Sequence, residues 1–298
     1  MNLSIILINY NSTSFTIDCI KSIKTVVSNQ LSYEILVIDN NSNNDEVANL
    51  KNEFLNADFK DITLIESNRN TGFSGGNMIG ARIAKGNYLA FVNNDTIFHE
   101  DSFSILFKFM QQNKNIGVST CLSKNKDGIN YACFDHFIGI RKEIFGRWLL
   151  ENLFDKPKRK LQYIEPIAVD AVQGCLMFFN KSVFIQCGGF DEKLFLFYEE
   201  IDICKRVKDL GYQVVYNPNT YFVHFQGAST KKSINKKKEI MISFFYVLKK
   251  NFGVTKFYIV SVYFLFKYIF KTIFNFKNVV FLKIILSQNK FRFSMRNI

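Results

Sequence analysis

The sequence has little of what marks several protein classes. Only three prolines and 15 glycines occur in 298 residues, which excludes collagen-like and proline-rich linker architectures. The six cysteines form no CxxC pair, and most lie in apolar stretches, which favours buried thiols over a disulfide framework. The N-terminus lacks the basic region of a signal peptide, and the apolar run at residues 3–8 is too short for one. We therefore expect a cytoplasmic protein.

Acidic residues are almost absent from the C-terminal part of the chain. The formal net charge is +12. From Lys231 to the end there are 15 Lys and Arg against one acid, Glu239, so these 68 residues carry +14 while residues 1–230 are nearly neutral. Such a charge indicates an anionic partner, either a membrane or a nucleic acid. No nucleic-acid-binding motif accompanies it, so we expect no nucleic acid.

The Phe-rich tail, residues 231–298, lacks an uncharged run of the ~18 residues that a membrane-spanning helix needs. Its longest uncharged run is residues 257–266. If residues 249–271 form one helix, four lysines project from one side of it: Lys249, Lys256, Lys267 and Lys271. We expect a helical tail lying on an anionic membrane surface at the inner face of the cell membrane. The alternative is that its Phe residues pack on the rest of the chain or form a homodimer.

Residues 1–230 alternate apolar strands with helical patterns. Buried strands are predicted at residues 3–9, 33–39, 62–66 and 88–93, and helical or glycine-rich segments separate them. Residues 123–165 are less regular. A helix near 198–210 and short strands within 213–223 complete this part. The pattern predicts one α/β domain over residues 1–230, with a mostly parallel central sheet and flanking helices.

Polar residues follow the predicted strands, at the edge where open α/β sheets bind ligands. These clusters are residues 9–11, 39–42 and 93–95. A carboxylate such as Asp95 can hold a hard divalent cation together with substrate phosphates, although a turn or helix cap would use the same residues. The glycine-rich residues 70–77 match neither a P-loop nor a dinucleotide fingerprint, and they form either a ligand-binding loop or a tight connection.

Carboxylates are concentrated between Asp191 and Asp202. Apolar residues at 201, 204, 207 and 210 predict a helix there, with Gly211 just past its end and a surface ion pair between Asp202 and Arg206. This cluster is either a solvated helix face or the position of a general base. His224 stands among apolar residues, and it is either a packed side chain or a metal ligand.

In this order and spacing, the motifs resemble family 2 glycosyltransferases, most closely the rhamnosyltransferase-like branch. The resemblance covers about residues 3–226. The matching segments are residues 6–11, 37–42, 70–77, 91–96, 174–177 and 188–206. The resemblance implies the GT-A fold and an inverting, metal-dependent transferase. Two departures are Asn93, where many members have the first Asp of a DxD motif, and Glu200, where Asp is more usual.

The resemblance also implies a role for individual residues. Glu200 would be the catalytic base, and Asp95 and His224 would bind Mg²⁺ or Mn²⁺. Asp39 would contact the base or ribose of the donor. The other donor-binding residues would be Asn9, Asn11, Asn70, Gly72, Asn77 and Asn94. The residues near the acceptor would be Gly174, Asp191, Glu199, Asp202 and Arg206.

The function implied is transfer of a hexose, such as rhamnose, from a UDP- or dTDP-linked donor. The acceptor would be a glycan, lipid-linked, in surface polysaccharide biosynthesis. The alternative is a non-catalytic nucleotide- or membrane-binding protein that keeps the fold. The acids at 95, 199 and 200 favour the enzyme.

Overall fold

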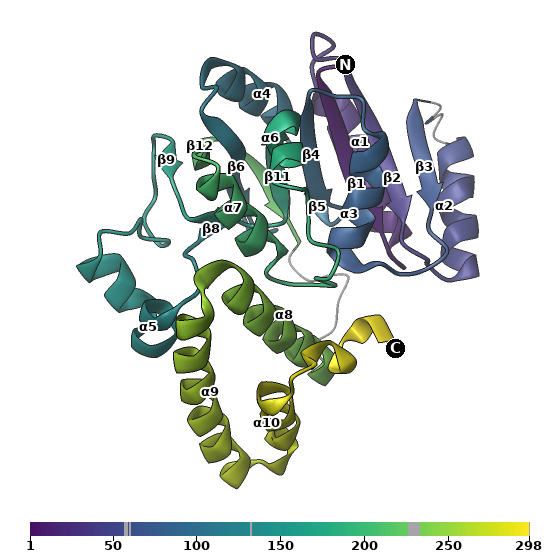
Figure 1. Ribbon diagram of the computed structural model, residues 1–298. Coiled ribbons are helices and arrows are strands. Elements are labelled where there is room, and N and C mark those ends of the chain that lie inside the picture. The colour runs from purple at the N-terminus through teal and green to yellow at the C-terminus, as the bar shows by residue number, and fades with distance from the viewer. Residues whose placement is uncertain (57–58, 60, 132, 226–232, 298) are drawn as a thin grey trace.

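A computed structural model shows a twisted β-sheet flanked by helices, with the C-terminal helices below it (Figure 1). It describes residues 1–56, 59, 61–131, 133–225 and 233–297. In chain order the elements up to residue 225 are β1 (Leu3–Asn9), α1 (Thr13–Val26), β2 (Tyr33–Asp39), α2 (Asn44–Asn56), β3 (Ile62–Glu66), α3 (Gly72–Ile83), β4 (Tyr88–Asn93), β5 (Thr96–Ile97), α4 (Ser102–Gln112), β6 (Ile116–Lys124), β7 (Asn130–Tyr131), β8 (Phe134–Asp135), α5 (Ile140–Leu153), β9 (Ile167–Ala168), β10 (Ala171–Val172), β11 (Leu176–Asn180), α6 (Lys181–Gln186), α7 (Glu199–Asp209) and β12 (Gln213–His224).

The central sheet is mixed, with the strand order β3-β2-β1-β4-β11-β6-β12-β5. The neighbours β3, β2, β1 and β4 are parallel, as are β6 and β12, whereas β11 runs antiparallel between β4 and β6. The predicted α/β fold with a mostly parallel sheet is confirmed. The antiparallel insertion of β11 departs from a simple β–α alternation.

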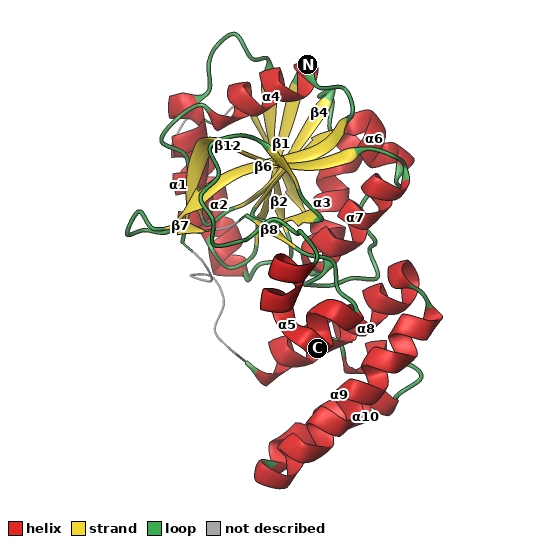
Figure 2. Ribbon diagram, turned by 90° about the vertical axis from the view of Figure 1, so that its left-hand side faces the viewer, coloured by secondary structure: helices red, strands yellow, loops and turns green. Residues whose placement is uncertain are grey.

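The sheet changes direction at β1. The chain adds β2 and β3 on one side of β1 and then returns to add β4 on the other side. Right-handed crossovers therefore place α1 and α2 on one face and α3 on the opposite face, as Figure 2 shows. The carboxyl ends of β1 and β4 diverge at this switch point, which is where open α/β sheets bind ligands.

Two glycines let α3 lie directly on the strands. A Cβ at Gly76 would stand 2.8 Å from Ile8 Cδ1, and one at Gly80 would stand 2.7 Å from Ile6 Cγ2. Any larger side chain would push the helix outward. The spacing of glycines in this segment therefore fixes the position of the loop that precedes α3.

The tail consists of helices, as expected, but residues 249–271 do not form one helix. Its elements are α8 (Ile234–Phe252), α9 (Val254–Phe274) and α10 (Val279–Leu286), with short 3-10 segments at Phe276–Asn278, Lys290–Phe293 and Met295–Asn297. Gly253 takes a φ of 93°, which ends α8 and reverses the chain into α9. Lys249 therefore belongs to a different helix from Lys256, Lys267 and Lys271. The expected boundary at residues 230–231 lies outside the described residues.

Helix α8 contacts α7 of the sheet domain and α9 contacts α5, while α9 and α10 run together away from the sheet itself (Figure 2). Within the described residues, α9 is the one helix long and apolar enough to cross a membrane, judged by length and composition alone. Its mean hydropathy is 1.5, and 6% of the apolar window is buried. Three lysines interrupt this helix, which is why an uncharged run of sufficient length is missing from the sequence.

Candidate functional site

The carboxyl ends of β1 and β2 hold Asp39 in a fixed orientation. Asn9 donates to Asp39 Oδ1 at 2.9 Å, and the backbone N–H of Ser42 donates to Oδ2 at 3.0 Å. Thr16 donates to the side-chain oxygen of Asn9 at 2.8 Å, and Asn11 donates from its backbone to Ser42 Oγ at 2.9 Å. Asn9, Asn11 and Asp39, all predicted to bind the donor, thus form one connected network.

Asn94 joins the same edge of the sheet from β4. Its side-chain amide donates to Ser12 Oγ at 2.7 Å and to Thr16 Oγ1 at 2.8 Å. Because Thr16 also contacts Asn9, the ends of β1 and β4 are linked across the switch point. The four predicted donor residues from these strands therefore lie together.

Asn40 organises the glycine-rich loop. Its side-chain nitrogen donates to Asn70 Oδ1 and to the carbonyl of Gly72, each at 3.1 Å, and its oxygen accepts from Thr71 Oγ1 at 2.9 Å. Asn40 belongs to the matching segment at residues 37–42, but the resemblance implied no role for it. Its position directly after Asp39 is the feature of the sequence that could have indicated this structural role.

The glycine-rich loop also contacts the segment that leads to the acidic cluster. Gly72 has a φ of 71°, and a Cβ there would stand 2.1 Å from the carbonyl oxygen of Phe195. That carbonyl accepts the backbone N–H of Phe73 at 2.8 Å. Phe195 precedes Glu199 by four residues, so the structure brings the predicted donor loop next to the predicted base segment.

Two polar side chains of α3 are buried without a partner among the described residues. They are Ser74 Oγ and Asn77 Nδ2, and Asn77 is only 2% exposed. A buried donor left without an acceptor costs ~1–3 kcal/mol. Asn77, predicted to bind the donor, therefore has an open hydrogen-bonding capacity.

Asp95 and His224 face each other although 129 residues separate them. His224 Nε2 lies 3.1 Å from Asp95 Oδ1, and the backbone N–H of Phe225 donates to the carbonyl of Asp95. Burial lowers the pKa of His224, but the hydrogen bond to Asp95 and the electrostatic contributions of Cys175 and Asp95 together outweigh it and leave the pKa raised. His224 is thus a paired histidine rather than one packed only among apolar residues.

The Asp95–His224 pair fits a divalent cation in its chemistry. An oxygen and a nitrogen ligand suit Mn²⁺, and a bound diphosphate would supply further oxygens. Within the described residues, no group of three or more His, Cys, Asp or Glu side chains could hold a metal alone. The pair therefore fits an ion that arrives with a phosphate-bearing ligand.

Glu199 and Glu200 begin α7, after a strained turn. Phe197 and Tyr198 take φ values of 70° and 67°, a left-handed conformation that costs roughly 1–3 kcal/mol for a residue with a side chain. Burial raises the pKa of Glu200 to about 7, and Asp135 raises it while Lys142 lowers it. A carboxyl group with a pKa near neutrality is suited to general base catalysis.

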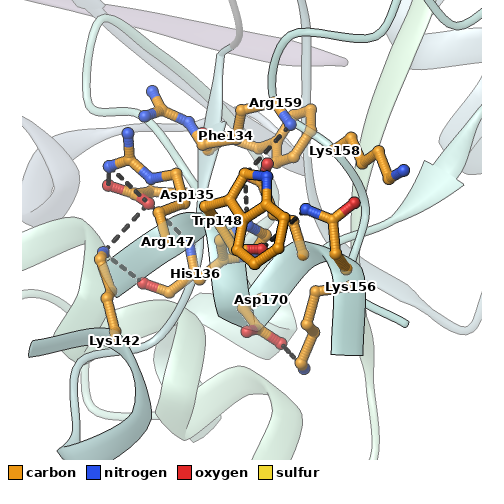
Figure 3. A network of polar contacts seen from close by, with 12 residues as sticks. Phe134, Asp135, His136, Lys142, Arg147, Trp148, Lys156, Lys158, Arg159 and Asp170 are labelled. Carbon is orange, nitrogen blue, oxygen red and sulfur yellow. Dashed lines mark hydrogen bonds and ion pairs between the residues drawn. The ribbon is translucent and has the colours of Figure 1, made fainter. Parts of the chain in front are cut away.

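The electrostatic partners of Glu200 come from the irregular segment at residues 123–165, for which the sequence predicts no function. Figure 3 shows Asp135 linked to Lys142 and Arg147, at 3.0 and 3.5 Å. In the same network Lys156 pairs with Asp170 at 2.8 Å. Asp135 lies on β8, which pairs with β10, and β10 contacts α7. No local sequence signal connects these residues to Glu200, because only tertiary pairing brings them together.

Glu199 is buried beside Glu200. Burial, followed by the charge of Glu200, raises the pKa of Glu199 well above its ordinary value. Its Oε2 has no hydrogen-bond partner among the described residues.

Gly174, also predicted near the acceptor, lies beside the ring of Phe73. A Cβ added to Gly174 would stand 3.5 Å from that ring.

The other predicted acceptor residues hold α7 and α8 together. Asp202 is 0% exposed and pairs with Arg206, so this ion pair is buried and not on the surface as expected. Asp202 also accepts from Asn251 and Lys250 of α8, each at 2.8 Å. Asp191 accepts from Tyr246 and Lys250, each at 2.7 Å. The structure thus places Asp191, Asp202 and Arg206 at the tail contact, and their roles near an acceptor stay predictions.

Comparison with known proteins identifies the family of this fold. Residues 4–186 match the model of glycosyl transferase family 2. Rhamnosyltransferase WbbL of Escherichia coli is 24% identical over 148 residues, which are 48% of this chain and 54% of that protein. The low-salt glycan biosynthesis hexosyltransferase Agl10 of Haloferax volcanii is 28% identical over 211 residues, 70% of this chain and 62% of the other.

A third relative matches over a shorter segment. The N-acetylglucosaminyl-diphospho-decaprenol L-rhamnosyltransferase of Mycobacterium tuberculosis is 34% identical over 59 residues, 20% of this chain and 19% of the other. The chain spans less than two thirds of the length of the curated relatives it matches.

Solved structures share the fold at low identity. GalNAc-T7, solved with UDP, GalNAc and Mn²⁺, aligns with a TM-score of 0.64 and 17% identity, over 84% of this chain and 48% of the other. The mannosyltransferase PcManGT of Pyrobaculum calidifontis, solved with GDP-Man and Mn²⁺, aligns with a TM-score of 0.59 and 14% identity. The alignment covers 84% of this chain and 63% of the other. With the family match over residues 4–186, the chain belongs to glycosyl transferase family 2.

Proposed function

We propose that this glycosyltransferase moves a hexose, such as rhamnose, from a UDP- or dTDP-linked donor to a lipid-linked glycan, with inversion at the anomeric carbon. The observation that carries the proposal is the convergence of Asp95 and His224, 3.1 Å apart, at the switch point of the sheet. The relatives described above include rhamnosyltransferases and a hexosyltransferase. Two structures with the same fold hold a nucleotide or nucleotide-sugar with Mn²⁺.

In this proposal the donor lies across the ends of β1, β2 and β4. Asp39, held by Asn9 and Ser42, accepts hydrogen bonds from the ribose or base. Asn77 offers its free N–H₂ group, and the loop after β3 approaches the donor through Gly72. Asp95 and His224 would hold Mg²⁺ or Mn²⁺, which supplies neutralisation of the diphosphate charge.

Glu200 acts on the acceptor. Its carboxylate takes the proton of an acceptor hydroxyl, whose oxygen forms the new bond to the anomeric carbon. The bond between that carbon and the diphosphate oxygen breaks, and its electron pair leaves with the nucleoside diphosphate. In-line displacement inverts the configuration, and a pKa of about 7 keeps a large fraction of Glu200 ready to accept the proton at neutral pH.

The tail is proposed to hold the enzyme on the inner, anionic face of the cell membrane. Large apolar side chains of α9 project into solvent, each between 43% and 75% exposed. They are Val254, Tyr258, Ile259, Val262, Phe266, Ile269, Phe270, Ile273 and Phe274. At ~100° per residue these side chains fall on one side of the helix, and Lys256, Lys267 and Lys271 lie along one border of the stripe. This arrangement suits a helix in a membrane interface.

Donor turnover tests the catalytic proposal. We expect Mn²⁺-dependent release of nucleoside diphosphate from one UDP- or dTDP-sugar of a panel, and loss of both this release and metal-dependent donor binding in Asp95→Ala. Asp101→Ala serves as a control, because Asp101 caps α4 and lies outside the network of the switch point. Unchanged donor affinity and EDTA sensitivity in Asp95→Ala would contradict the metal assignment. Donor binding without turnover, with every acceptor tried, would favour a non-catalytic protein that keeps the fold.

Co-sedimentation with vesicles tests the membrane proposal. The variant Phe266→Ser/Phe270→Ser/Phe274→Ser should lose most of its binding to anionic vesicles. A matched control, Leu55→Ser/Ile129→Ser/Ile185→Ser, removes exposed apolar residues of the sheet domain and should keep that binding. Each lysine near the surface contributes ~1 kcal/mol, which salt screens. Pelleting with neutral vesicles that does not depend on salt would contradict the proposal. It would also be contradicted if the wild type is a homodimer in the absence of vesicles and the triple Phe variant is a monomer.

A further inference from the structure

A cavity of about 450 Å³ lies between the tail helices and the segment that carries the catalytic base. This volume is within the range of small-molecule sites. Tyr198, the residue before Glu199, lines it together with side chains of α8, α9 and α10. Glu143 of α5 lines it as well. The cavity therefore starts two residues from the proposed base and extends into the tail.

Aromatic rings follow one another along this cavity. Tyr198 lies 5.6 Å from Phe244, measured between ring centroids, and Phe244 stacks on Phe264 at 5.1 Å. Tyr268 is the next ring, 6.3 Å from Phe264, and Phe281 of α10 lies 5.1 Å beyond it. All five rings line the cavity. They form a continuous apolar path from the start of α7 to α10, which would accommodate an unsaturated hydrocarbon chain.

Positive charge accompanies the rings. Lys237, Lys271 and Lys277 line the same cavity, and Glu143 is the acid among its lining residues. No salt bridge to an acid is present for these three lysines within the described residues. Lys271 Nζ lies over the ring of Tyr268, 5.3 Å from its centroid. An apolar cavity whose ammonium groups form no ion pair among the described residues is complementary to an anionic amphiphile.

The position of Lys271 relates the cavity to lipid. Lys271 both lines the cavity and borders the exposed apolar stripe of α9 described above. A lipid could therefore enter from the membrane side of α9 without crossing open water. At its other end the cavity reaches Tyr198, where the acceptor sugar has to meet Glu200.

We infer that this cavity binds the phosphate-linked isoprenoid of the acceptor, with its phosphate on Lys237, Lys271 and Lys277 and its first isoprene units on the aromatic path. The inference rests on the proposed function, because it assigns a place to the lipid part of the proposed acceptor. The isoprenoid is chosen over a bulk phospholipid because the five rings follow one another in a single series, which suits one unsaturated chain better than two acyl chains. The tail thus serves as an acceptor site in addition to a membrane contact.

Farnesyl phosphate is the probe, used with the full chain and without added metal so that its phosphate is not drawn to Asp95 and His224. We expect calorimetry to show binding that neither farnesol nor inorganic phosphate reproduces. Lys237→Gln/Lys271→Gln/Lys277→Gln should weaken it by at least about tenfold, as expected when charged hydrogen bonds are lost. The control, Lys249→Gln/Lys256→Gln/Lys283→Gln, removes the same charge from exposed tail positions and should change it little.

Several outcomes would overturn the inference. These are equal weakening by the two triple variants, binding no tighter than that of inorganic phosphate, and full displacement of the probe by phosphatidylglycerol vesicles. Melting temperatures of both variants verify that they are folded. Mn²⁺-dependent donor hydrolysis, measured on the same proteins, should be unchanged in both triple variants. If the wild-type protein lacks donor hydrolysis, the proposed function fails, and the farnesyl phosphate measurement still decides whether the cavity binds a lipid phosphate.

Discussion

Replacing Glu200 with Gln should strongly reduce transfer and at the same time stabilise the protein. The pKa of Glu200 is about 7 in the folded protein, against an ordinary value of 4.5. Each unit of difference corresponds to about 1.4 kcal/mol, so the ionised carboxylate costs up to about 3 kcal/mol of folding free energy at pH 8. Glu200 is partly exposed, and a Gln amide also needs hydrogen bonds, so we expect a gain of about 1–2 kcal/mol in Glu200→Gln.

The gain should depend on pH with a definite sign. Between pH 4.5 and about 7 the folded protein keeps the Glu200 proton while the unfolded chain releases it, so the wild type loses stability as the pH rises through this range. Glu200→Gln has no such loss. The difference in unfolding free energy should therefore be small near pH 4.5, grow up to about pH 7 and stay constant above it. Transfer by the wild type should rise over the same range, because only the ionised base accepts a proton.

Urea unfolding from pH 5 to 9 and a transfer assay measure both effects. Transfer should fall by about 10²–10⁴-fold in Glu200→Gln while donor affinity is kept. Glu199→Gln is the matched control, since it removes an adjacent buried carboxylate and should leave transfer largely intact. A Glu200→Gln protein that is less stable at pH 8, or whose difference from wild type is independent of pH, would refute the electrostatic reasoning. If Glu200→Gln keeps near-full turnover while Glu199→Gln or Asp191→Asn has none, the base is another carboxylate.

Three further predictions concern the contacts around the site. Burial alone would raise the pKa of Asp191, but hydrogen bonds from Lys250 and Tyr246 hold it below its ordinary 3.8, so Asp191→Asn should cost about 1.5–3 kcal/mol at pH 7 in urea unfolding. That cost should disappear as the pH falls below 3.8, and a cost independent of pH would contradict the ion pair. Gly72→Ala should destabilise by about 2 kcal/mol or more, because of its φ of 71° and the Phe195 carbonyl, and an unchanged melting temperature would contradict this contact. Removing residues 231–298 should release the protein from membranes and keep donor binding at Asp39 and Asp95, but lower stability and transfer; full transfer by a soluble truncated protein would show that the tail does not support Glu200.

The sequence predicted the sheet edge of the site well because buried parallel strands have a simple pattern. Each of β1 to β4 is a short apolar run that ends at a polar residue, and their observed bounds match the predicted ones. The residues that follow such strands must gather at one edge of the sheet. Asn9, Asp39 and Asn94 are therefore close together for a reason that the linear sequence contains.

Other features depend on tertiary pairing and left no local signal. Strand β11 runs antiparallel between β4 and β6, and a short apolar run carries no information about direction. Asp135 influences Glu200 only because β8 pairs with β10 beside α7. The end of α8 at Gly253 was readable in principle, since glycine with a positive φ often ends a helix, but the continuous apolar pattern around it favoured one helix.

The Asp202–Arg206 pair explains why the tail matters for the catalytic segment. Spacing alone predicted a pair on an exposed helix face, where it would contribute little. In the structure Asp202 is fully buried because Asn251 and Lys250 of α8 cover it and complete its hydrogen bonds. A buried carboxylate that loses such partners is strongly destabilising, so α7 cannot move away from α8 without a cost in free energy. Since Glu200 is in the first turn of α7, the same contact that docks the tail fixes the orientation of the proposed base, and the position of the tail helices is thereby coupled to that of Glu200.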